Sequence, residues 1–115
     1  MINIYEFAKS KENTELIVLP DENATEIHIY RPTQAIIEQL KSINCRKPFN
    51  EKTFRAEFNI LASMILSNNV EKIGFSPEWV KKHFSYEVMS WFYECVFAWW
   101  NGEPVQQLRK RVRNN

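Results

Sequence analysis

The stretch SYEVMSWFYECVFAWWN at residues 85–101 decides the fold, because it is apolar on most sides and has a clear start and end. Ser85 is a good helix N-cap, and Asn101-Gly102 followed by Pro104 is typical of a helix end. At about 100° per residue, the polar and small side chains share one narrow stripe and leave an apolar arc of roughly 240°. That stripe consists of Glu87, Ser90, Glu94, Ala98 and Asn101. We expect this helix to be surrounded by the rest of the domain, or to pack inward on one side and to meet another protein on the other. The two roles can also be combined.

Three further helices are predicted upstream from caps and from apolar residues at helical spacing. Residues 33–43 form the first, which starts at Pro32 or Thr33. Residues 50–67 form the second, with Asn50 as N-cap and Phe49 and Phe54 as a hydrophobic staple. Residues 76–83 form a short third helix with serine at the N-cap and proline at the first helical position.

The N-terminal part has a different pattern. Residues 2–8 predict a short helical turn, and residues 9–15 are polar and predicted to be irregular. Leu16–Leu19 and Glu26–Tyr30 read as strands, separated by the turn residues Pro20-Asp21-Glu22-Asn23. With strands confined to 14–31, the predicted fold is mainly α: a compact helical domain of four to five helices with a small N-terminal β-hairpin.

Length and composition bound the class of protein. The 115 residues predict a single domain over 1–115, with 1–13 and 103–115 as flexible or peripheral ends. Hydrophobic residues make up 44% and charged residues 25%, which is typical of a globular protein. Only two cysteines are present, the start lacks a signal-peptide pattern, and the apolar run Val88–Trp100 is too short to span a bilayer. We therefore expect a cytoplasmic protein that is not secreted.

Catalytic motifs are absent from the sequence. Gly74 and Gly102 are the only glycines, so a glycine-rich phosphate loop is excluded. His28 and His83 have no metal-type partner spacing, and Cys95 falls on the apolar side of the last helix, where it reads as a small hydrophobe. We expect no enzyme activity, no cofactor and no metal.

Nucleic-acid binding has two weak indications. The helices 76–83 and 85–101 have the outline of a helix-turn-helix, but the second offers aromatic residues and glutamate where base contacts need Arg, Lys, Asn or Gln. The net charge is only +1, although the basic tail at 109–113 is suited to phosphate contacts. Besides a protein that binds a partner protein (a client), two functions stay open. One is a small regulator that binds nucleic acid through this tail, and the other is a homo-oligomeric structural protein without a client.

The layout resembles a known family. A hairpin leads through Tyr30-Arg31-Pro32-Thr33 into a helix, and Gly74-Phe75-Ser76-Pro77-Glu78-Trp79-Val80 precedes a Trp-rich final helix. Over residues 14–102 this resembles the tail assembly chaperones of long-tailed phages of Gram-positive hosts. The resemblance rests on layout, size and the FSPEWV helix start, not on a specific motif.

The resemblance implies a non-enzymatic chaperone in the host-cell cytoplasm that coats the apolar, helical tape measure protein during virion morphogenesis. It also implies self-association, and in many relatives a frameshifted form that contacts the tail tube protein. The family has no catalytic or ligand signature to carry over residue by residue.

The partner-binding surface is predicted from the aromatic residues of the last two helices. Aromatic side chains, Trp and Tyr above all, dominate the energetics of protein interfaces. Tyr93 and Phe97 lie one turn apart, Trp100 continues their row, and Trp91 borders the polar stripe. The candidate residues are Trp79, Trp91, Tyr93, Phe97 and Trp100, with core packing as the alternative role of each. Because the apolar arc exceeds what one small core needs, we also expect a homo-oligomer.

Overall fold

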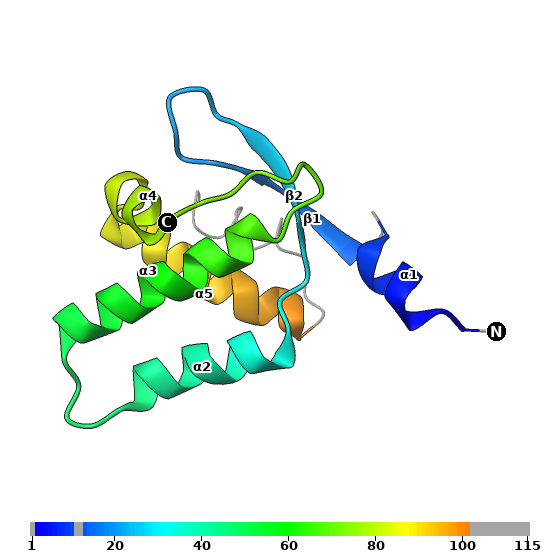
Figure 1. Ribbon diagram of the computed structural model, residues 1–115. Coiled ribbons are helices and arrows are strands. Elements are labelled where there is room, and N and C mark those ends of the chain that lie inside the picture. Colours follow the sequence, from blue (N-terminus) through cyan, green and yellow to red (C-terminus); the bar gives the residue numbers. More distant parts are fainter. Residues whose placement is uncertain (1, 11–12, 102–115) are drawn as a thin grey trace. The chain divides into compact units, whose positions relative to one another are not determined.

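The computed structural model describes residues 2–10 and 13–101, and it is mainly helical with one small hairpin, which confirms the predicted fold class (Figure 1). The chain divides into two compact units, Met1–His83 and Phe84–Asn115, which are described separately. A single domain over 1–115 stays a prediction. Gly102, Pro104 and the basic tail at 109–113 lie outside the described residues.

The hairpin pairs β1 (Thr14–Val18) with β2 (Glu26–Tyr30) in antiparallel register, with Thr14 opposite Tyr30. The prediction for β2 is confirmed, but β1 starts two residues earlier than predicted and ends one residue earlier. The prediction of irregular structure at 14 and 15 is therefore wrong, because these polar residues pair with the end of β2. One face of the hairpin is buried through the alternating Ile17, Ile27 and Ile29.

The turn between the strands is held by Asp21. Its carboxylate accepts hydrogen bonds from the backbone N–H of Thr25 at 2.9 Å and from the Thr25 hydroxyl at 2.7 Å. These two bonds, the backbone one first, hold the pKa of Asp21 below its usual value. Asp21, one of the predicted turn residues, thus stabilises the turn through its side chain, as aspartate commonly does in tight turns.

The helices α2 (Gln34–Cys45) and α3 (Glu51–Ser67) pack against each other, and α3 also contacts β2. The Asn50 side chain caps α3 by accepting from the N–H of Thr53 at 3.0 Å, and the Phe49 and Phe54 rings lie 5.6 Å apart as the predicted staple. The buried apolar residues of these two helices recur at helical spacing and form a large part of the core of this unit. They are Ile37, Leu40 and Ile43 of α2 and Phe58, Leu61, Ala62, Ile65 and Leu66 of α3.

The segment after α3 pairs with β2 of the hairpin, and this pairing was not predicted from the sequence. Residue 69 forms an isolated antiparallel bridge with Ile29, and backbone bonds join Tyr30 N–H to the Asn68 carbonyl and Val70 N–H to the His28 carbonyl, both at 2.9 Å. The side chain of Asn69 is buried and holds the loop. Its amide donates to the carbonyls of Leu66 and Ile73 at 2.7 Å, and its oxygen accepts from the Ile73 N–H at 2.9 Å.

Glu71 fixes the same loop to β2 from outside. Its carboxylate accepts from the His28 N–H at 2.8 Å and lies 2.7 Å from His28 Nδ1. Burial by itself raises the pKa of Glu71, but the hydrogen bonds from His28 together outweigh it and hold that pKa below its ordinary value. The loop is thereby attached to the hairpin through backbone hydrogen bonds and through the Glu71 carboxylate.

Two short helices complete the first unit. The helix α4 (Pro77–His83) begins after Ser76, whose hydroxyl accepts from the Trp79 N–H at 3.1 Å, and it packs against α3 with Val80 fully buried. The helix α1 (Ile4–Lys9) is the predicted N-terminal turn and has no buried residue. Its end is tied to the hairpin, where the Lys9 ammonium lies 5.0 Å from the centre of the Tyr30 ring.

Candidate partner-binding surface

The second unit is built around α5 (Tyr86–Trp100), as predicted. The Ser85 hydroxyl accepts from the Val88 N–H at 3.2 Å and satisfies one of the N–H groups that a helix start leaves unpaired. Four residues are buried: Phe92, Cys95, Val96 and Trp99. They are spaced three and four apart and form one stripe, which is much narrower than the apolar arc of the helix. Several apolar side chains of α5 are therefore only partly covered.

Three of the predicted residues form a row beside this buried stripe. The Tyr93 and Phe97 rings lie 4.7 Å apart between centroids, and both side chains are half-buried. Trp100 falls within about 60° of both around the helix axis and is 37% exposed. We call Tyr93, Phe97 and Trp100 the aromatic ridge. It lies between the buried stripe and the polar stripe marked by the exposed Glu87 and Glu94.

Tyr86, which was not predicted as a partner-binding residue, lies on the same side of α5. Tyr86 precedes Tyr93 by seven residues, which is about two turns, so it falls at nearly the same angle around the axis. Its side chain is 65% exposed, and Met89 lies half-buried between these two turns. The seven-residue spacing in the sequence contained this signal, and it extends the row towards the N-terminus of α5.

Trp91 lies on the other flank of α5. It is two residues from Tyr93 and therefore about 160° away around the axis. The side chain is half-buried, whereas Phe92 and Val96 are buried, so Trp91 is more accessible to solvent than these two. Trp91 thus cannot join the aromatic ridge on one face of the helix, and its part in binding stays a prediction.

Trp79 belongs to the first unit and takes part in a local ring stack. Its indole lies 4.8 Å from the Phe75 ring in an edge-on arrangement and 4.3 Å from the stacked His83 ring. The ring nitrogen Nδ1 of His83 lies 2.9 Å from the Trp79 carbonyl oxygen, which orients the imidazole. The half-buried indole therefore packs with its neighbours in the chain, and its contact with a partner stays a prediction.

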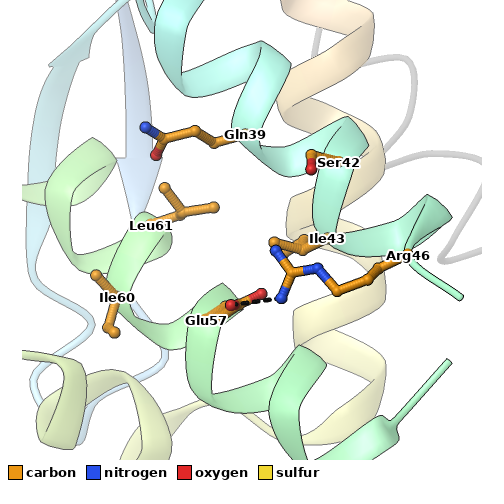
Figure 2. Close-up of a pocket in the computed structure, with 7 residues that line it drawn as sticks. All are labelled: Gln39, Ser42, Ile43, Arg46, Glu57, Ile60 and Leu61. Carbon is orange, nitrogen blue, oxygen red and sulfur yellow. Dashed lines mark hydrogen bonds and ion pairs between the residues drawn. The ribbon is translucent and has the colours of Figure 1, made fainter. Parts of the chain in front are cut away.

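A pocket of about 230 Å³ lies between α2 and α3 in the first unit (Figure 2). Ile43 and Leu61 are its buried apolar lining, and the half-exposed Ile60 lies at its side. Arg46 and Glu57 close one end with an ion pair of 2.7 Å between Nη1 and Oε1. The second carboxylate oxygen of Glu57, Oε2, is buried and has no hydrogen-bond partner among the described residues.

Within residues 2–10 and 13–101, no group of three or more His, Cys, Asp or Glu side chains is placed to hold a metal ion. No helix in those ranges is long and apolar enough to cross a membrane. Comparison with protein-family models, curated proteins and solved structures found no match.

Proposed function

We propose that this protein is a non-enzymatic chaperone that binds an apolar, helical client along the aromatic ridge of α5. The observation that carries the proposal is the partial exposure of Tyr93, Phe97 and Trp100 next to a buried stripe that already supplies the helix with a core face. The resemblance to the tail assembly chaperones makes the tape measure protein of a phage the proposed client, and the host-cell cytoplasm the place of action.

The chemistry of the ridge suits such a client. A row of large rings one turn apart can pack along an amphipathic helix, whose own apolar side chains recur every three to four residues. Tyr and Trp combine a wide apolar surface with a polar group at the edge, so they tolerate water before the client arrives. Residues of this kind at the centre of an interface contribute about 2 kcal/mol or more each to binding.

Two partners follow from the resemblance and belong to the proposal. The chain would self-associate, because a chaperone that coats a long client needs several copies along it. A frameshifted longer form would contact the tail tube protein.

Tyr86 adds to the proposed client surface, and Trp91 and Trp79 remain candidate contacts outside the aromatic ridge.

The test is a pull-down of the chain with an apolar helical fragment of the tape measure protein. The gene of that long helical protein is expected next to the gene of this chain. Tyr93→Ala and Trp100→Ala should each weaken binding by about 30-fold, which corresponds to about 2 kcal/mol. Their melting temperatures should stay near that of the parent. Glu94→Ala is the matched control, since it removes an exposed residue of the same helix from the polar stripe. It should leave binding and melting unchanged.

Two results would contradict the proposal. If Tyr93→Ala and Trp100→Ala both bind the client like the parent, the client does not use this ridge. If the chain instead binds DNA with an affinity that falls steeply with salt and ignores the client, the regulator with a basic tail is the better description.

A further inference from the structure

The sequence that follows α5, outside the described residues, has the pattern of a second amphipathic helix. Residues 104–113, here called the C-terminal segment, begin with a proline, which suits the first position of a helix. Val105, Leu108 and Val112 are three and four residues apart and would share one face of such a helix. Basic residues gather in its second half, where the helix dipole favours them. Three residues, 101–103, separate the segment from α5, a loop length typical of two antiparallel helices.

The apolar spacing of the C-terminal segment mirrors that of the aromatic ridge. The ridge residues are spaced by four and then three residues, and the apolar residues of the segment by three and then four. Two helices that pack antiparallel bring these two orders into register. A helix of ten residues spans about 15 Å, and the ridge from its first to its last residue about 10 Å, so the segment can cover all of it. The facing pairs would be Val105 with Trp100, Leu108 with Phe97 and Val112 with Tyr93.

Charge favours the same arrangement. In an antiparallel pair, the side chains that directly follow the apolar row on one helix lie opposite those that follow it on the other. Glu94 follows Tyr93 and is exposed on the polar stripe, and Arg109 follows Leu108. The two would therefore meet, with Arg113 one turn further along the same flank. An exposed ion pair contributes little affinity, so this pair selects the direction of the segment rather than holding it in place.

We propose that the C-terminal segment folds back as a helix onto the aromatic ridge of the same chain and leaves it when the client binds. The segment offers the ridge the same apolar spacing that a helical client offers. Its role as a competitor rests on the proposed function, whereas the contact itself needs no client. Because a helix of ten residues is marginal by itself, the covered state outweighs the open state only a few-fold, and a client can displace the segment.

Hydrogen exchange with mass spectrometry on the full chain tests the contact without client. Amides of residues 108–113 should exchange about threefold more slowly in the parent than in Trp100→Ala, which leaves the sequence of the segment unchanged. Glu87→Ala is the matched control, because it removes an exposed residue of the polar stripe nearly two turns before Tyr93, and it should exchange like the parent. Equal exchange in the parent and in Trp100→Ala overturns the proposal. Slow exchange that appears only as the protein concentration rises places the segment on a second copy and also overturns it.

The second experiment changes the C-terminal segment and measures client binding. Leu108→Ser removes the central apolar side chain of the segment, and Gln107→Ser is the matched control on the other side of the predicted helix. Leu108→Ser should bind the tape measure fragment about threefold more tightly than the parent, because the fraction of open ridge sets the apparent affinity. Its amides at 108–113 should exchange faster by the same factor, and Gln107→Ser should match the parent in both measurements.

The two measurements separate the possible failures. Faster exchange in Leu108→Ser without tighter client binding contradicts the competition. A segment that is protected in the parent and released in Trp100→Ala, in a chain that binds no client, contradicts the proposed function and the competition but not the contact. A chain that binds the client while its segment exchanges equally fast in the parent and in both variants contradicts the contact and leaves the proposed function intact.

Discussion

The loop from Ser67 to Phe75 and the helix α5 differ in opposite ways from what their sequences suggest. The loop is rich in polar residues, yet its Asn69 is buried and each polar atom of that side chain has a partner. The helix is apolar around most of its circumference, yet only four of its residues are buried. Tyr93, Phe97 and Trp100 remain partly in contact with water.

Polarity alone therefore does not determine which groups a fold buries. The loop belongs to the fold because its donors and acceptors are satisfied within the chain, and leaving such buried groups unpaired is costly. Part of the apolar surface of the aromatic ridge stays exposed to water after folding, and a partner can bury this part. Substitutions in the loop should therefore affect folding, and substitutions on the ridge should affect binding.

The largest effect on the loop is expected from Asn69→Ala. The change removes three hydrogen bonds and leaves the carbonyls of Leu66 and Ile73 and one N–H without partners. We expect a loss of about 2–3 kcal/mol in the free energy of unfolding, measured by urea denaturation. Asn68→Ala is the matched control. Its side chain is exposed and its carbonyl keeps the bond to Tyr30, so the change should cost less than about 0.5 kcal/mol. Equal losses for both variants would show that the buried amide does not hold the loop.

A smaller and pH-dependent effect is expected from Glu71→Gln. The pKa of Glu71 is lowered from its ordinary value of 4.5, so the carboxylate stabilises the fold above that pH, and this contribution is lost as pH falls through the lower pKa of the folded state. Because the side chain is 31% exposed, the contribution at pH 7 is at most about 1 kcal/mol.

Urea denaturation at pH 7 and pH 3 measures this effect. Glu71→Gln should be less stable than the parent at pH 7, and this difference should shrink at pH 3. Glu26→Gln, an exposed change in the same hairpin, should match the parent at both values. A difference for Glu71→Gln that is as large at pH 3 as at pH 7 would rule out the carboxylate as its origin.

The sequence predicted the elements that depend on local signals. Asn50, Ser76 and Ser85 each cap a helix with their side chains, and β2 follows its alternation of buried and exposed residues. The contacts that depend on distant segments were not predictable in the same way. The two polar residues at the start of β1 are strand only because β2 pairs with them, and Asn69 joins Ile29 across forty residues of chain.

The candidate surface was predictable in part for the same reason. Helical spacing placed Tyr93, Phe97 and Trp100 on one flank, because it needs only the geometry of one helix. The same spacing included Tyr86, whose exposure only the structure revealed. Trp79 was grouped with these residues by composition, but its ring stack with Phe75 and His83 depends on local packing in α4. The pocket between α2 and α3 requires two helices to be placed and had no signal in the sequence.

Two phenylalanines of the same helix distinguish a core face from a partner-binding face. Phe92 is 3% exposed on the buried stripe, whereas Phe97 is half-buried on the aromatic ridge. Urea denaturation at low micromolar concentration and without client should show a loss of about 3–5 kcal/mol for Phe92→Ala. Phe97→Ala should lose less, about 1.5 kcal/mol, because part of its side chain is already exposed to water. A loss for Phe97→Ala as large as that for Phe92→Ala would show that the ridge is part of the protein's own core, and would contradict its assignment as a partner-binding surface.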